Sequence, residues 1–245
     1  MTELLATQAI ILVAALIQGY CGFGFALVLV PLLLGLGLDE KLIVAGMAIF
    51  ILPGTVAVAC PLRRHIQWRI VSITMVALVP GVWIGAEFLK RVESTWFMLG
   101  LGALLVAVST VGLLRPRRRA LRPSLSASLA VGLASGALGG AYGTGGPPLF
   151  LYYRHAGLAP DAYKGTIVTI FCLAGVVRLV CYTAEGLMPW TTVQWGLLGI
   201  PAAVIGNVAG HALYRRTPRQ GVRVVVDLAL IAIGIALIAR AMGLP

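Results

Sequence analysis

Two glycine-rich motifs lie inside long apolar stretches of this 245-residue chain. Residues 22–24 read Gly-Phe-Gly, and residues 143–148 read Gly-Thr-Gly-Gly-Pro-Pro. Glycine loosens a helix, and paired prolines remove amide donors and clash with the preceding turn. Each motif therefore predicts a break between two half-helices. Because the amino-terminal end of a half-helix offers unpaired amides and a partial positive charge, the two motifs indicate a binding site for a small anion.

Arg178 is the one basic residue well inside an apolar stretch, at residues 163–183. Such a charge is costly in a membrane and usually faces a cavity or the protein interior. Arg178 could bind the anion or pair with Glu87, and Asn207 could bind the substrate or join two helices; the sequence leaves both questions open. The candidate binding residues are Gln18, Gly22, Phe23, Gly24, Tyr142, Gly143, Thr144, Gly145, Gly146, Arg178 and Asn207.

The composition indicates that membrane helices position these residues. Hydrophobic residues make up 60% of the chain and charged residues only 11%, with a mean hydropathy of +0.98. Soluble domains are less apolar and about a quarter charged, so a soluble fold is excluded. The net charge of +11 comes from short basic clusters between apolar stretches, which is typical of membrane topology and not of nucleic-acid binding. We therefore expect an all-α integral membrane protein.

Eight apolar stretches can be marked, and two of them have an unusual length. They cover residues 4–34, 42–60, 69–89, 96–114, 125–153, 163–183, 190–214 and 219–243. A membrane-spanning helix needs about 20 apolar residues. The first and fifth stretches are too long for one span and too short for two, and they contain the two glycine motifs. Each could be a re-entrant hairpin of two half-helices or one long, broken crossing.

The distribution of Lys and Arg favours hairpins. If all eight stretches cross the membrane, nine basic residues fall on each side. If the first and fifth stretches return to the face they entered from, fourteen fall on one side and four on the other. Basic residues gather on the cytoplasmic side of a membrane. This prediction places the protein in the cytoplasmic (inner) membrane with both termini outside.

An internal repeat accompanies the hairpins. At an offset of 121, one glycine motif matches the other, and stretch 69–89 matches stretch 190–214; the pairs are Gly19/Gly140, Gly22/Gly143, Gly24/Gly145, Pro80/Pro201, Ile84/Ile205 and Gly85/Gly206. Each half would contain one hairpin and three crossings, so the halves would form two inverted repeats, as in many secondary transporters. We expect repeats at residues 1–114 and 125–245, joined by a basic cytoplasmic linker at 115–124.

The two motifs also resemble those of a known family. Residues 136–152, with their Gly-Thr-Gly-Gly-Pro-Pro run, resemble the second-half signature of the TauE/SafE sulfite exporter permeases, and residues 18–25, followed by Pro31, look like its first-half counterpart. The resemblance covers essentially the whole chain. It implies transport of sulfite, sulfonates or similar small sulfur anions, usually outward.

The favoured hypothesis is a secondary transporter that exports such an anion by alternating access. The alternative is an anion channel, or an uptake permease for another small oxyanion or a carboxylate. We expect no enzyme, because Thr144 has no evident His partner, and no cofactor or metal. The expected partners are the small anion and membrane lipid, without nucleic acid. A coupling ion (H⁺ or Na⁺) and a homo-oligomer stay open.

Overall fold

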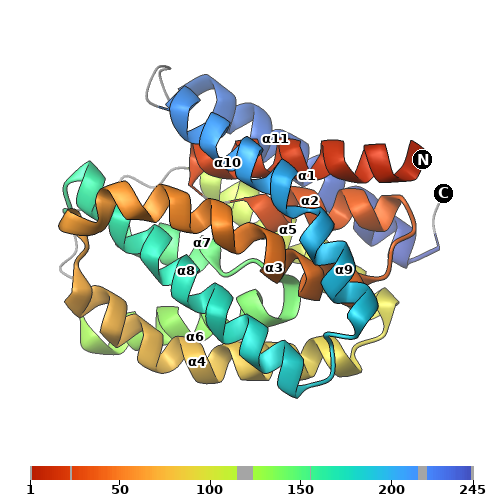
Figure 1. Cartoon of the computed structure of the whole chain (residues 1–245), viewed down its shortest axis with the longest axis horizontal. Helices are drawn as coiled ribbons and strands as arrows, with labels where there is room; N and C mark the ends of the chain where they lie inside the picture. The colour runs from red at the N-terminus through yellow and green to blue at the C-terminus, as the bar shows by residue number, and fades with distance from the viewer. Residues whose placement is uncertain (1, 23, 115–123, 155, 215–219, 244–245) are drawn as a thin grey trace.

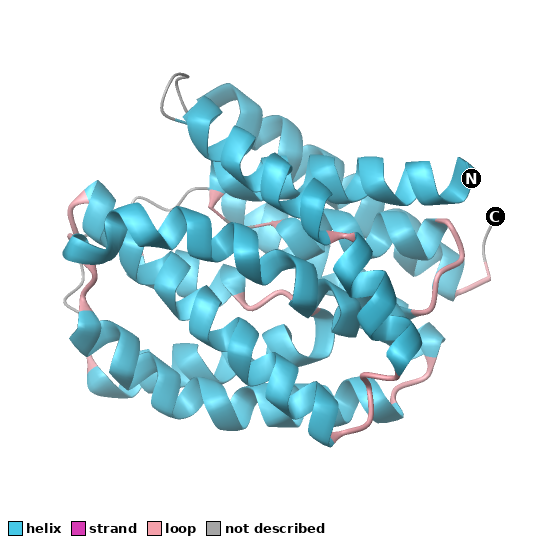
Figure 2. Cartoon of the chain, in the orientation of Figure 1, coloured by secondary structure: helices cyan, strands magenta, loops and turns pink. Residues whose placement is uncertain are grey.

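The computed structural model describes the whole chain except residues 1, 23, 115–123, 155, 215–219 and 244–245. The described residues form helices and connecting loops, with no strand among them (Figure 2). In chain order the elements are α1 (Thr2–Cys21), α2 (Phe25–Gly35), α3 (Glu40–Ala59), the 3₁₀ turn η1 (Cys60–His65), α4 (Trp68–Arg91), α5 (Ser94–Leu114), α6 (Leu125–Tyr142), α7 (Gly146–Tyr153), α8 (Pro160–Ala184), α9 (Trp190–Leu198), α10 (Ile200–Tyr214) and α11 (Gln220–Ala241). The predicted all-α class is confirmed.

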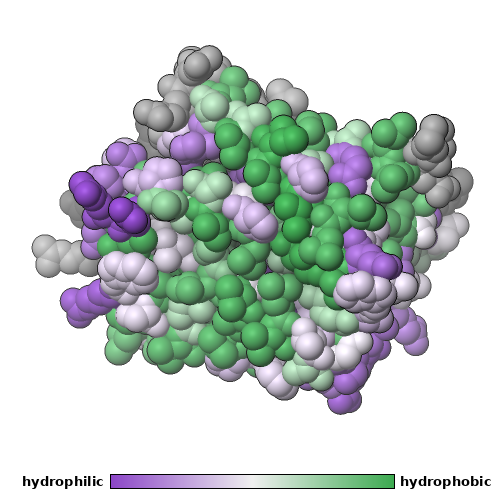
Figure 3. Space-filling view, viewed as in Figure 1, coloured by the Kyte–Doolittle hydropathy of each residue, from purple (hydrophilic) through white to green (hydrophobic). Residues whose placement is uncertain are grey.

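The helices are long and apolar enough for a multi-pass membrane protein. Within the described residues, five spans qualify by length and hydropathy: α3 with η1, α4, α5, α6 and α8. A sixth is added if α9 and α10, bent by 41° at their junction, count as one span. Figure 3 shows apolar side chains across the middle of one face and hydrophilic ones gathered toward its two ends. Large apolar side chains such as Val76 (70% exposed) and Ile84 (58% exposed) lie on the surface of the molecule, which suits contact with lipid.

Both predicted helix breaks are present. Gly22 and Gly24 have φ values of 85° and 102° between α1 and α2, and Gly143, at the carboxyl end of α6, has a φ of 72°. These left-handed conformations are unfavourable for residues with a Cβ atom but accessible to glycine. The sequence pattern thus interrupts both apolar stretches at the residues expected.

The chain turns back on itself at each break. The carboxyl end of α7 returns to the start of α6, where the backbone amide of Ser124 donates a hydrogen bond to the Tyr152 hydroxyl (3.0 Å). In Figure 1, α1 starts at the right of the view and the α2–α3 connection lies at the right again, whereas α6 starts at the left. At the end of α2, the Leu34 carbonyl oxygen accepts a hydrogen bond from Arg240 Nη1 of α11 (3.4 Å).

Glycines bring α4 and α6 into backbone contact. A Cβ atom added at Gly81, Gly85 or Gly140 would collide with a backbone carbonyl of the facing helix. The oxygens concerned belong to Leu133, Ala137 and Val82, respectively. Small residues at a membrane helix interface allow this close approach, which increases van der Waals contact. The two helices are therefore parallel neighbours with a fixed register.

The contact between α1 and α10 has the same pattern. Added Cβ atoms at Gly206, Gly210 and Gly19 would meet the backbone oxygens of Leu12, Leu16 and Asn207. These six residues correspond one by one to the residues of the α4–α6 contact. Residues of α1 correspond to residues of α6 that lie 121 positions later, and residues of α4 correspond to residues of α10 that lie 125 positions later. The contacts thus move the predicted match of α4 with α10 by four residues. A shift of four residues is about one helical turn and leaves the same residues on the same face. The spacing of Pro and Gly in the sequence could therefore not determine the alignment of α4 with α10.

A further link joins α4 to α8 at one end of the molecule. Lys90 Nζ lies 2.9 Å from Glu185 Oε2. The hydrogen bond from Lys90 holds the pKa of the Glu185 carboxyl below its usual value. Glu87 pairs with Arg91 on its own helix, so a pair with Arg178, one of the two possibilities that the sequence left open, is not what the structure has.

The close α4–α6 contact predicts that Gly136 cannot be enlarged. A Cβ atom there would collide with the Leu78 carbonyl oxygen, so Gly136→Ala should lower the free energy of unfolding by roughly 1–3 kcal/mol, as overpacking does. Gly35→Ala is the matched control, because a Cβ atom at Gly35 meets nothing within 4 Å. Thermal unfolding of the purified protein in detergent measures both variants. Equal midpoints for the two would contradict the inferred contact.

Candidate functional site

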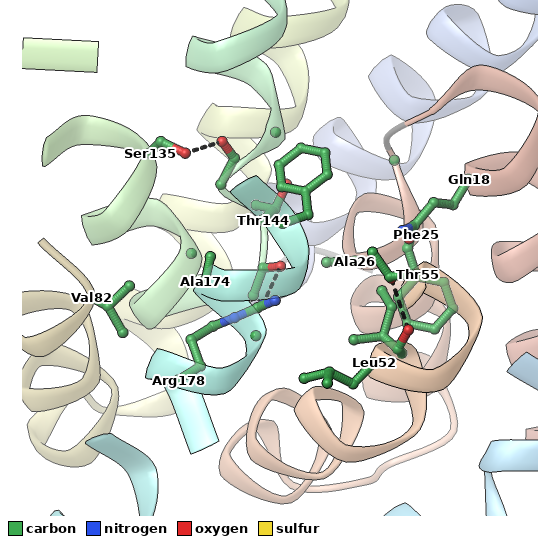
Figure 4. A pocket seen from close by; sticks show the side chains of 18 residues that line it. Gln18, Phe25, Ala26, Leu52, Thr55, Val82, Ser135, Thr144, Ala174 and Arg178 are labelled. Carbon is green, nitrogen blue, oxygen red and sulfur yellow. Dashed lines mark hydrogen bonds between the residues drawn. The ribbon is translucent and has the colours of Figure 1, made fainter. Parts of the chain in front are cut away.

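A cavity lies where the two hairpins approach each other. Its volume is about 50 Å³, whereas one water needs roughly 10–15 Å³, so it can hold a molecule of a few non-hydrogen atoms. Figure 4 shows Gln18, Phe25, Ala26, Leu52 and Thr55 on one side and Val82, Ser135, Thr144, Ala174 and Arg178 on the other. The remaining lining residues are Gly24, Ile51, Gly139, Gly143, Gly145, Gly146, Phe171 and Gly175.

The amino-terminal ends of both short half-helices line this cavity. Gly24 is the residue preceding α2, and its neighbours Phe25 and Ala26 form the first turn. On the other side, Gly145 precedes α7 and Gly146 begins it. First-turn amides have no partner within their own helix and carry a partial positive charge. The cavity therefore receives positive electrostatic potential from two helix ends.

Arg178, on α8, supplies a full positive charge. Its side chain is only 7% exposed, and Nη1 donates a hydrogen bond to the Gly143 carbonyl oxygen (3.0 Å). Its buried Nε has no hydrogen-bond partner in the described structure. Among the cavity-lining residues Arg178 is the one charged side chain. An anionic ligand would accept a hydrogen bond from Nε and would offset the buried positive charge.

Hydroxyl groups hold the turn of the second hairpin in place. Ser135 donates to the Gly145 carbonyl oxygen, and Tyr182, on α8, donates to the Gly140 carbonyl oxygen (2.8 Å). The backbone amide of Thr144 donates to the Leu138 carbonyl oxygen (3.3 Å). Because Arg178 and Tyr182 join α8 to the end of α6, the position of the guanidinium group relative to the turn before α7 is fixed.

The structure brings together seven of the eleven residues predicted for the site. The seven that line the cavity are Gln18, Gly24, Gly143, Thr144, Gly145, Gly146 and Arg178. Gly22 and Asn207 line a second, smaller cavity next to it. Tyr142 instead packs against the rings of Phe88 and Phe97, with centroid separations of 5.9 and 5.0 Å, and Phe23 lies outside the described residues.

Several lining residues were not predicted. Thr55 and Leu52 come from α3, Ser135 from α6 and Phe171 from α8. Phe171 stands seven positions before Arg178, and a spacing of two turns places both on one helix face, so this spacing could have identified it. No sequence signal distinguishes Thr55 or Ser135 from hydroxyls that only bond their own helix.

The fold and the cavity define a multi-pass membrane protein with an internal site suited to a small solute. The family model described as "Sulfite exporter TauE/SafE" matches residues 8–237, and the chain belongs to this family. It is therefore a transporter and not an enzyme. It is 26% identical over 212 residues to the probable sulfite/organosulfonate exporter TauE of Cupriavidus necator. The aligned region covers 85% of this chain and 83% of the relative. No solved structure matches.

The geometry at the hairpin turn predicts a large effect of Gly143→Ala. Gly143 (φ 72°) and Gly186 (φ 73°) are both left-handed, so alanine at either position adds roughly 1–2 kcal/mol of backbone strain. Only at Gly143 would the new Cβ atom also collide with buried Met47, whose side chain would have to move within the core. Gly143→Ala should therefore unfold at a lower temperature in detergent than the Gly186→Ala control. A lower unfolding temperature for Gly186→Ala than for Gly143→Ala would contradict the close contact between Gly143 and Met47.

Proposed function

We propose that this protein is a secondary transporter that exports a small sulfur oxyanion, sulfite or an organosulfonate, across the cytoplasmic membrane by alternating access. The observation that carries the proposal is the buried guanidinium of Arg178, which lines an internal cavity and whose Nε has no hydrogen-bond partner among the residues that the structure describes. The family and the printed name of the relative support the choice of a sulfur oxyanion.

The lining of the cavity suits an oxyanion. The Arg178 guanidinium can form a charge-assisted hydrogen bond to one oxygen through Nε. Amides at the starts of α2 and α7 approach from the other sides, and the Thr144 and Thr55 hydroxyls supply further polar contacts. Because Pro147 and Pro148 have no amide hydrogen, Gly145 and Gly146 are the residues that offer donors at the start of α7.

Two inverted repeats, residues 1–114 and 125–245 joined by the basic segment 115–124, would supply the alternating access. Two features support this proposal. The α1–α10 contact matches the α4–α6 contact residue by residue, so each hairpin packs against the same kind of helix from the other half. The two hairpins also start at opposite ends of the molecule (Figure 1). Rocking of one half against the other around the cavity would expose Arg178 to each side in turn.

A carrier fits the cavity better than a channel does. A channel needs a continuous aqueous path, whereas the described cavity of about 50 Å³ is followed by one of only about 10 Å³. An anion in the central cavity must therefore wait for a conformational change. In this proposal a gradient of H⁺ or of Na⁺ drives the conformational change.

Replacing Arg178 should abolish most of the transport. A hydrogen bond to a charged group contributes about 1.5–3 kcal/mol, so Arg178→Gln should weaken sulfite binding and sulfite flux into proteoliposomes by about 10- to 100-fold. Arg178→Lys should recover part of the loss, because lysine keeps the charge without the planar donor set. Arg69→Gln, which removes an exposed charge on α4, is the control. Wild-type flux in Arg178→Gln would overturn the proposal, and single-channel currents would favour the channel.

The proposed topology predicts which residues are accessible from each side. Arg63 and Arg64, in η1, and Arg154, directly after α7, belong to the end of the molecule that we assign to the cytoplasm. Lys90, in the last turn of α4, and Glu93, just before α5, belong to the other end (Figure 1). In a chain whose native cysteines are replaced by serine, an impermeant maleimide should label Glu93→Cys in intact cells and Arg154→Cys only after lysis. Both positions are exposed. Labelling of both from outside would contradict the hairpins, and the reverse pattern would contradict the orientation.

A further inference from the structure

A second, smaller cavity adjoins the central one. Gln18, Thr55 and Phe171 line both cavities, so the two are neighbours. The smaller cavity has a volume of about 10 Å³, close to the minimum for a single water. Its other lining residues are Gly19, Gly22, Val58, Lys164, Val168 and Asn207. It therefore lies beyond the central cavity in the direction of the first turns of α8.

One face of α8 connects the two cavities. Lys164, Phe171 and Arg178 follow each other at intervals of seven residues, which is close to two helical turns and keeps them on one side of the helix. At about 1.5 Å per residue, Lys164 and Arg178 stand about 21 Å apart along the helix axis. A cationic side chain thus lies at each end of this face, with an aromatic ring between them that lines both cavities.

The surroundings of Lys164 hold its positive charge at the wall of the smaller cavity. Its Nζ lies 2.8 Å from Nδ1 of His211 and 3.8 Å from the ring centroid of Tyr214. An ammonium group has only donors, so the imidazole nitrogen accepts, and the face of the tyrosine ring attracts the cation. Both contacts hold the ammonium group at this position.

Asn207 adds an independent indication of a ligand site. It is only 2% exposed, and its amide nitrogen is buried without a hydrogen-bond partner in the part of the chain that the structure describes. A buried donor without an acceptor is unfavourable. The central cavity contains the same feature at Arg178 Nε. Both cavities therefore combine a basic side chain with a buried, unpaired nitrogen donor.

We propose that Lys164 and Asn207 form a second binding site for the transported oxyanion, separated from the Arg178 site by Phe171. The inference rests on the proposed function, because it takes an anion at Arg178 as the substrate. The ring of Phe171 stacks on that of Phe150, with centroids 6.2 Å apart, and the smaller cavity is too narrow for an oxyanion in this conformation. The anion would bind first at Lys164 and reach Arg178 when the Phe171 ring moves aside.

The test compares binding with transport, using sulfite as the probe. Lys164→Gln should raise the sulfite concentration for half-maximal flux about tenfold and weaken its dependence on ionic strength, because a charge at an entrance raises the local anion concentration. Equilibrium binding at Arg178 should change much less than the half-maximal concentration, since the two cations stand about 21 Å apart along α8 and Coulomb interaction falls with distance. Lys164→Arg should behave like the wild type, and Arg154→Gln, which removes an exposed charge at the same end, is the control.

Asn207→Asp provides a second, nearly isosteric variant in case Lys164→Gln does not fold. It places a carboxylate at the wall of the same cavity and should raise the half-maximal concentration in the same way. Equal kinetics of Lys164→Gln, Asn207→Asp and Arg154→Gln, together with loss of flux in Arg178→Gln, would overturn the second site alone. Normal sulfite binding and flux in Arg178→Gln would instead overturn the proposed function.

Discussion

The uncompensated charge of Arg178 is the constraint around which the rest of the site is arranged. A buried guanidinium in an apolar environment is strongly unfavourable unless hydrogen bonds or an opposite charge offset it. Among the described residues the Gly143 carbonyl oxygen accepts a hydrogen bond from the guanidinium, and Nε has no partner. The ion pairs of the described residues, Lys90–Glu185 and Glu87–Arg91, lie elsewhere. In the proposed function a bound anion completes the arrangement, because it offsets the charge and accepts from Nε, which a neutral ligand would do less well.

The scaffold serves to hold two helix ends and this charge at one place. Glycines with positive φ end α1 and α6 well inside the molecule, and other glycines let each hairpin press against a parallel helix of the other half. Contacts of this kind fix the register of the helices through backbone atoms, which cannot adjust as side chains can. The carboxyl end of α6, just before α7, is further tied to α8 by Arg178 and Tyr182. The proposed anion site therefore depends on backbone geometry more than on a set of polar side chains.

The sequence predicted the parts of this arrangement that have a strong local cause. Hydropathy gave the helices, the Gly-Phe-Gly and Gly-Thr-Gly-Gly-Pro-Pro motifs gave the breaks, and an arginine inside an apolar stretch indicated the charged group. Thr55 and Ser135 were not predicted, because a hydroxyl on a membrane helix usually bonds its own backbone, as Thr55 does to the Ile51 carbonyl oxygen. The four-residue shift between α4 and α10 was not predicted either, because one helical turn leaves the pattern of faces unchanged. Such features depend on tertiary contacts, which no local pattern records.

The most direct test of the central claim is an experimental structure of the protein with sulfite bound. The account predicts the anion between the start of α2 and the start of α7, with an oxygen about 2.7–2.9 Å from Arg178 Nε, the usual length of a charge-assisted hydrogen bond. An anion bound away from this cavity, or an acidic side chain paired with Arg178, would contradict it.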